Sequence, residues 1–259
     1  MLMVGADGAG SRVARQLLPG AGRIDTGIVA ISGRFALDDQ ARRETPAAVF
    51  RGPTLIMGPA GVFMFASAVE YPPEAKPIYD TDEYVMWGIS ARRRDFGLDR
   101  SPDSLDPEAA RRLALRHTEG WAPALRRMIE RADPAYMTAF AVKTAAEVGP
   151  WPTRNVTLLG GALHNMTPFR GMVANAALYD AQLLAEALVG VAEGRHALLP
   201  ALAAYERDMI EHGFAAVRGS LGDMNRLHAK SGLQRFVTKA FFRLVDIAPP
   251  LQRALCGTR

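Results

Sequence analysis

The sequence is poor in the residues that build disulfides, metal centres and membrane anchors. Its one cysteine, Cys256, excludes an internal disulfide and a cysteine-based metal cluster. The five histidines show neither the HExxH pattern nor another paired ligand spacing, so no metal site is predicted. No apolar run approaches the roughly 20 residues that span a bilayer, and no signal peptide stands at the N-terminus. The expected location is therefore the cytoplasm.

The sequence also lacks a cluster of charge of one sign. Lys and Arg number 31 against 27 Asp and Glu, and the two kinds are interleaved along the chain. The densest basic run, Arg92 to Arg94, is followed at once by Asp95, and we interpret it as a solvated strand end. Nucleic-acid binding normally needs a clustered basic face, so it is not expected.

What the sequence has instead is a set of short apolar runs separated by glycine and proline. Residues 1–18 indicate the end of a strand, a glycine turn and a short helix. Between residues 24 and 69, and again in "EYVMWGISARR", such runs predict the strands of a mixed or antiparallel sheet. Asp106 followed by Pro107 predicts a helix start, and Pro123 divides the helical run that follows.

A second strand, glycine loop and helix follow the sheet-rich middle. Residues 156–159 lack polar alternation, which favours a buried parallel strand. Gly190 is predicted to end the next helix. The predicted apolar face of that helix comprises Ala174, Ala177, Leu178, Ala181, Leu184, Ala185 and Leu188. Helical spacing continues to the C-terminus, where an amphipathic helix over 233–250 either docks on its own domain or contacts a membrane surface.

Each glycine turn leads into a helix N-terminus, where free backbone N–H groups can be approached closely. Such a site suits a pyrophosphate or a polarisable ring. Neither turn is a GxGxxG motif, because Arg12 and Val13 stand where the third glycine of the first turn is due. Two such elements around a sheet-rich middle indicate one α/β layer interrupted by an inserted domain.

The segments "VGADGAGSRVARQLLP" and "VTLLGGALHNMTPFRGMVANAALYDA" resemble two motifs of the para-hydroxybenzoate hydroxylase-like, single-component FAD-dependent aromatic hydroxylases. The order of the motifs and the insert between them also fit, so the resemblance covers nearly the whole chain. It implies an α/β fold in which a partial FAD-binding, Rossmann-like layer is interrupted by a mixed or antiparallel substrate sheet. The implied divisions are 1–22 with 150–195 for FAD, 23–149 for substrate, and 196–259 for C-terminal helices.

The resemblance also implies which residues hold the cofactor. Asp7 and Gly8 would shape a groove shared by flavin and NAD(P)H, and the loop before the second helix would line the isoalloxazine ring. The implied cofactor-binding residues are Asp7, Gly8, Gly160, Gly161, Pro168, Gly171, Met172, Val173 and Asn175. No catalytic residue is assigned, and His164 is interpreted as structural rather than as a base.

The departures from the family pattern weaken this expectation. The motif's flavin-binding Asp is Gly161 here, Val173 replaces a loop glycine, and Arg170 replaces a small residue. Each departure removes about one hydrogen bond or one close approach. Each such loss corresponds to about 1 to 3 kcal/mol of interaction free energy. The family's GxGxxG unit, which holds the ADP half of FAD, does not precede Met1. The chain is therefore expected to be N-terminally truncated, and a second chain is one way to complete the FAD domain.

Two functions follow from these expectations. In the first, NAD(P)H reduces bound FAD, and O2 forms a flavin C4a-hydroperoxide that hydroxylates or epoxidises a small hydrophobic or aromatic substrate, as the resemblance implies. In the second, the chain is a flavin-free descendant that binds or cyclises a metabolite, or serves as a complex subunit. The loss of the motif Asp at Gly161 favours the second function, and the preserved loop and helix favour the first.

Overall fold

The computed structural model of the protein describes residues 1–72, 74, 82–99 and 101–230. The chain forms two compact units. Unit 1 comprises Met1–Ala30, Arg93–Leu105 and Ala139–Asn225, and unit 2 comprises Ile31–Arg92, Asp106–Thr138 and Arg226–Arg259. The predicted helix over 233–250 lies outside the described residues.

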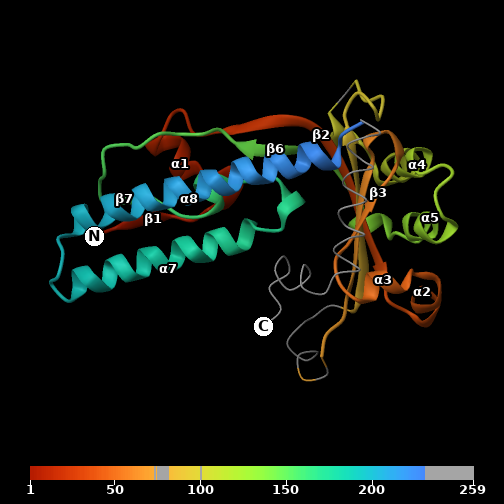
Figure 1. Ribbon diagram of the computed structural model, residues 1–259, viewed down its shortest axis with the longest axis horizontal. Coiled ribbons are helices and arrows are strands. Elements are labelled where there is room, and N and C mark those ends of the chain that lie inside the picture. The colour runs from red at the N-terminus through yellow and green to blue at the C-terminus, as the bar shows by residue number, and fades with distance from the viewer. Residues whose placement is uncertain (73, 75–81, 100, 231–259) are drawn as a thin grey trace, which may run out of the picture. The chain divides into compact units, whose positions relative to one another are not determined.

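Unit 1 is built on a short parallel sheet and two long helices (Figure 1). Strand β1 (Met3–Gly5) pairs with β7 (Val156–Leu158), and Gly5 lies opposite Leu158. The 3-10 turn η1 (Gly8–Gly10) and helix α1 (Arg12–Leu17) follow β1, whereas α6 (Gly161–His164) follows β7. The long helices α7 (Val173–Ala192) and α8 (Leu198–Leu227) run side by side. The predicted parallel strand over 156–159 is confirmed.

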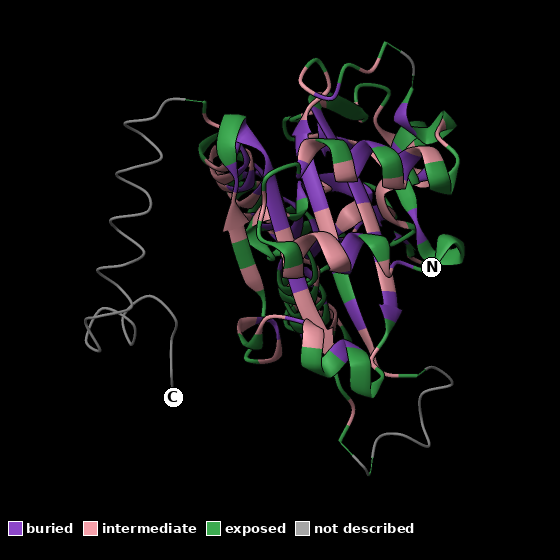
Figure 2. Cartoon of the chain, turned by 90° about the vertical axis from the view of Figure 1, so that its right-hand side faces the viewer, coloured by how far each residue is buried: buried purple, intermediate pink, exposed green. Residues whose placement is uncertain are grey.

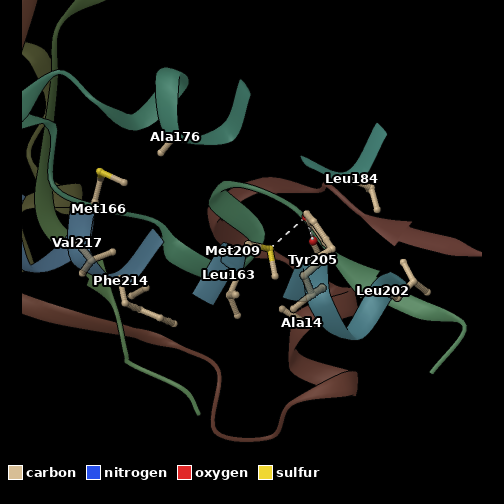
Figure 3. Packing of buried hydrophobic residues seen from close by; sticks show 12 residues of the cluster. Ala14, Leu163, Met166, Ala176, Leu184, Leu202, Tyr205, Met209, Phe214 and Val217 are labelled. Atoms are coloured by element: carbon tan, nitrogen blue, oxygen red, sulfur yellow. Dashed lines mark hydrogen bonds between the residues drawn. The ribbon is translucent and has the colours of Figure 1, made fainter. Parts of the chain in front are cut away.

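In the core of unit 1, residues of β7 pack against helix α8 (Figure 3). The Tyr205 hydroxyl donates to the Leu158 carbonyl at 2.8 Å and lies 3.2 Å from the Met209 sulfur. On the next residue of α8, the buried Glu206 carboxylate accepts from the Thr157 hydroxyl at 2.9 Å. Burial raises the pKa of Tyr205, so this phenol remains a hydrogen-bond donor at neutral pH.

Unit 2 contains most of a five-stranded sheet of order β3-β4-β5-β2-β6. Its strands are β2 (Arg23–Ala36), β3 (Thr54–Met57), β4 (Phe63–Val69), β5 (Tyr84–Arg92) and β6 (Thr138–Ala145). Strands β3, β4 and β5 are antiparallel, with Phe65 opposite both Leu55 and Gly88. Strands β2 and β6 continue from one unit into the other.

Four helices lie on one face of the unit 2 sheet, and the buried residues concentrate on the strands behind them (Figure 2). They are α2 (Asp39–Glu44), α3 (Ala47–Phe50), α4 (Pro107–His117) and α5 (Pro123–Glu130). The Asp106 side chain caps α4 by accepting from the Ala109 amide at 2.7 Å, and α5 begins at Pro123. Both helix starts are as predicted. The fold class, an α/β chain with an antiparallel sheet and C-terminal helices, is confirmed.

Two predictions about helix α7 are wrong. The helix does not end at Gly190 but continues to Ala192, and Gly194 follows with a φ of +72°. A Cβ at Gly190 would lie 3.1 Å from the His196 ring, so this glycine serves close packing instead. The predicted apolar face of α7 is also wrong, because Leu178, which was assigned to that face, is 69% exposed. The buried residues of α7 are Ala176, Asp180, Leu184 and Gly190.

The packing of α8 predicts a large difference between two leucines near its start. Leu202 is fully buried in the unit 1 core, whereas Leu199 is 45% exposed. Leu202→Ala is expected to lower the free energy of unfolding by about 3 kcal/mol, because it leaves a cavity. Leu199→Ala is expected to change it by less than about 0.5 kcal/mol. Urea denaturation followed by circular dichroism measures both, and equal losses would contradict this packing.

Candidate functional site

The two glycine motifs meet at the carboxyl ends of the adjacent parallel strands β1 and β7. The Leu159 amide donates to the Gly5 carbonyl at 3.0 Å, so the two chains leave the sheet side by side. A Cβ placed on Gly161 would lie 3.7 Å from the Ala9 nitrogen and 3.8 Å from the Gly8 Cα. Segments about 150 residues apart in the sequence therefore share one edge of the sheet, which is where α/β proteins bind ligands.

The first motif is a turn that is stabilised by the side-chain carboxylate of Asp7. Asp7 Oδ2 accepts from the Arg12 amide at 2.7 Å, and Ser11 Oγ accepts from the Ala14 amide at 2.8 Å at the start of α1. The Ser11 hydroxyl, and then backbone amides that include that of Arg12, hold the pKa of Asp7 below its usual range. Asp7 is therefore an anion at neutral pH. Gly8 has a φ of +73° with open space around its missing Cβ.

The second motif depends on a buried carboxylate. Gly160 has a φ of +61°, and a Cβ there would lie 2.8 Å from the Ala177 Cβ, so the position requires glycine. Its amide donates to Asp180 Oδ2 at 2.7 Å. Asp180 is fully buried on α7 and so ties this helix to the end of β7.

Asp180 also bonds two histidines. Its Oδ2 lies 2.6 Å from His164 Nε2, and its Oδ1 lies 2.6 Å from His212 Nε2. His212 Nδ1 lies 2.7 Å from the Asp208 carbonyl, which can only accept, so His212 carries a proton on Nδ1. His212 therefore links the Asp180 carboxylate on α7 to the backbone of α8.

The sequence did not predict this group, because its members come from three helices. The three potential ligand atoms of His164, Asp180 and His212 lie within 4.8 Å of one another, which is close enough to surround a metal ion. Each atom already takes part in a hydrogen bond within the group, however. The His164 ring also packs directly against Gly213 of α8, where a Cβ would overlap it. The arrangement fits a structural role.

The loop before α7 ends in an uncapped helix start. Gly171 has a φ of +67° with open space around it, and Met172 and Val173 are exposed. The first amide bonded within the helix is that of Ala176, which donates to the Met172 carbonyl, and no side chain caps the start. The preceding N–H groups are therefore without a helical partner, and the positive end of the helix dipole faces outward with them.

Arg170 does not cover this helix start, contrary to what its bulk and charge suggest in the sequence. Its guanidinium contacts Gly219 of α8, and its Nε lies 3.7 Å from Asp223 Oδ2. The arginine is therefore directed towards α8.

All nine predicted cofactor-binding residues belong to unit 1. The structure places Asp7, Gly8, Gly160 and Gly161 together at the strand ends. It places Pro168, Gly171, Met172, Val173 and Asn175 on the loop and first turn of α7. Their assignment to a flavin stays a prediction. Among the described residues, no helix is both long and apolar enough to cross a membrane.

No protein-family model matches the chain. The dual O-methyltransferase/FAD-dependent monooxygenase elcB of Phaeosphaeria nodorum is 26% identical over 84% of this chain and 28% of the relative. A candidate FAD-containing monooxygenase from Photorhabdus luminescens has a TM-score of 0.77 and 30% identity, covering 86% of this chain and 60% of that one. HpxO of Klebsiella pneumoniae, solved with FAD and uric acid, has a TM-score of 0.73 at 21% identity, over 99% of this chain and 58% of that one.

These comparisons confirm the resemblance read from the two motifs, since the homologues and structural neighbours are FAD-dependent monooxygenases. The chain spans about a quarter of the first relative's length and about 60% of these solved structures.

Asp180 generates a prediction for stability. Asp180→Ala removes both carboxylate oxygens and leaves the Gly160 amide and the two histidine nitrogens without this partner. We expect a loss of about 3 kcal/mol in the free energy of unfolding, because removing one member of a buried hydrogen-bonded network is costly. Asp208→Ala, on the exposed side of α8, is the matched control and should change it little. Equal stability of wild type and Asp180→Ala would contradict the network.

The first turn generates a prediction for pH dependence. A lowered folded-state pKa means that Asp7 stabilises the fold above its unfolded pKa, and that this contribution is lost as the pH falls through the folded pKa. Ser11→Ala is expected to raise the pKa of Asp7 towards its ordinary value, because the hydroxyl is the largest cause of the lowering. An NMR titration of the Asp7 carboxyl carbon measures the shift. Ser11→Thr retains a hydroxyl and should leave the pKa low.

Proposed function

Because the homologues and structural neighbours of this chain are FAD-dependent monooxygenases, we propose that it forms the flavin-binding part of such an enzyme. The proposed substrate is a small aromatic or otherwise hydrophobic metabolite. The observation that supports this proposal is the meeting of two glycine turns at the carboxyl ends of adjacent parallel strands, where Gly160 also packs against Ala177 of α7.

The residues present fit a flavin in most respects. Gly8 and Gly171 both have positive φ and open space in place of a side chain, so a planar ring can approach the backbone there. The unpartnered amides of the first turn of α7 suit the polar edge of such a ring. The second motif lacks the carboxylate that, by the resemblance, bonds the ribityl chain, because this residue is Gly161.

In this proposal FAD supplies the oxygen-activating redox chemistry, and NAD(P)H is the proposed electron donor. The chain's own residues bind and orient the cofactor. The N-terminal amides of α7 stabilise negative charge on the ring edge through hydrogen bonds and the helix dipole. Asp7, ionised at neutral pH, fixes the turn that brings Gly8 to the site.

The alternative is a flavin-free descendant of the fold that binds a metabolite. Gly161 favours it, because no carboxylate stands where the cofactor's ribityl chain would need one. A single cofactor-binding experiment separates the two proposals.

Gly161→Asp is expected to tighten FAD binding by about tenfold, which is the effect of one added charge-assisted hydrogen bond. A Cβ fits at residue 161 without a close contact. Titration of the purified protein with FAD, followed by flavin absorbance and fluorescence, measures the affinity. Gly10→Asp adds the same charge beside the first turn, in open space, and should not tighten binding. A protein that stays colourless in wild-type and Gly161→Asp forms would favour the flavin-free alternative.

A further inference from the structure

An arginine on the unit 2 sheet lies against two tyrosine rings. The guanidinium carbon of Arg34, on β2, lies 3.6 Å from the centroid of the Tyr136 ring and 4.7 Å from that of the Tyr84 ring. Tyr84 begins β5, and Tyr136 ends the 3-10 turn η5 (Pro134–Tyr136) that precedes β6. Three segments that are distant in the sequence therefore meet at one cation, and all three belong to unit 2.

Arg34 lies on the face of the sheet that is opposite helix α5. A Cβ placed on Gly33 would lie 3.1 Å from the Cβ of Ala132, which follows α5, and 3.0 Å from the Trp87 ring of β5. Gly33 and Trp87 therefore face the helix. Because successive side chains of a strand point to opposite faces, Arg34 on β2 and Met86 on the adjacent β5 point away from it.

The guanidinium of Arg34 makes no hydrogen bond or ion pair with any residue that the structure describes. Two acids that are close to the tyrosines in the sequence are engaged elsewhere. Glu83 Oε2 lies 3.0 Å from the Arg42 guanidinium, and Asp133 Oδ1 accepts from the Ala135 amide at 2.9 Å. The N–H donors of Arg34 therefore remain available to a ligand.

Arg131 shows the same kind of contact with a carboxylate added. Its guanidinium carbon lies 5.6 Å from the centroid of the Phe35 ring, and its Nη2 lies 2.7 Å from Asp38 Oδ2. Arg34 is next to Phe35 on β2, and it has the aromatic contacts but no carboxylate partner among the described residues. A carboxylate that comes from a ligand would supply this partner.

The chemistry of the group suits a carboxylate with an apolar body. The two ring faces attract the cation and hold it in place, so less side-chain entropy is lost when a ligand binds. The planar guanidinium offers paired N–H donors that match the two oxygens of a carboxylate. Met86 and the Tyr136 ring, which are 37% and 50% exposed, offer apolar surface to the rest of the ligand.

We infer that Arg34, held by Tyr84 and Tyr136, binds the carboxylate of a small organic acid whose apolar body lies against Met86. None of these residues belongs to the two glycine turns, and all of them belong to unit 2. The site requires no bound flavin, so this inference goes beyond the proposed function and does not rest on it.

The test is an NMR titration of the full chain with sodium benzoate, followed through the Nε–H resonance of Arg34. Benzoate is expected to bind at least about tenfold more tightly than benzamide, because the amide lacks the charge that pairs with the guanidinium. Benzoate is also expected to bind at least about threefold more tightly than acetate, because a methyl group buries less apolar surface than a ring.

Three variants locate the site, and the benzoate resonances measure their binding. Arg34→Gln is expected to weaken benzoate binding at least about tenfold, because it removes the charge-assisted bonds. Tyr136→Leu removes the ring and should weaken binding about two- to fivefold. Arg43→Gln is the matched control, since Arg43 is an exposed cation of unit 2 on α2. It should change the affinity less than about twofold, because its charge is screened.

Three outcomes would overturn the inference. They are the absence of benzoate binding, equal binding of benzoate and benzamide, and an equal loss of affinity in Arg34→Gln and Arg43→Gln. Acetate binding as tight as that of benzoate would overturn the assignment of an apolar body and would favour an acidic side chain of a polypeptide. Circular dichroism of each variant confirms that the fold is retained. Failure of FAD to bind would leave these results unchanged, so the two proposals fail separately.

Discussion

The arrangement of unit 1 depends on the buried carboxylate of Asp180. A buried charge is costly unless its oxygens are satisfied, and this one is bonded by the Gly160 amide and by two histidines. Those bonds tie α7 to the end of β7 and to α8 at one point. The N-terminal half of α7 is thereby held against the second glycine turn, where Gly160 packs against Ala177. The geometry of the candidate cofactor site is therefore set by a group that does not belong to it.

The pairing of β1 with β7 provides the second constraint. A parallel pair brings the carboxyl ends of both strands to one edge, so each glycine turn leaves the sheet at the same level. At this edge Gly161 leaves the neighbourhood of the proposed flavin without the carboxylate that, by the resemblance, the family motif carries there.

The sequence was informative where a structural signal is local. Asp106, Pro107 and Pro123 mark their helix starts through capping and a fixed φ, and the unalternated strand over 156–159 is parallel as predicted. It failed where the signal is diffuse or distant. Helix α7 is rich in Ala and Leu on every side, so its periodicity does not identify the buried face, which includes a charged residue. His212 meets Asp180 only through tertiary packing, and no spacing in the sequence indicates that contact.

The short sheet of unit 1 also bears on how the protein behaves in concentrated solution. Among the described residues β1 pairs with β7 alone, so its other edge presents unpaired N–H and C=O groups. Met3 and Val4 beside that edge are exposed. Unprotected edges of this kind recruit strands from other chains, and natural proteins usually guard them with charge, proline or a covering element. The open edge of β1 is therefore a place where another chain can add a strand, and colloidal stability there is a property separate from the stability of the fold.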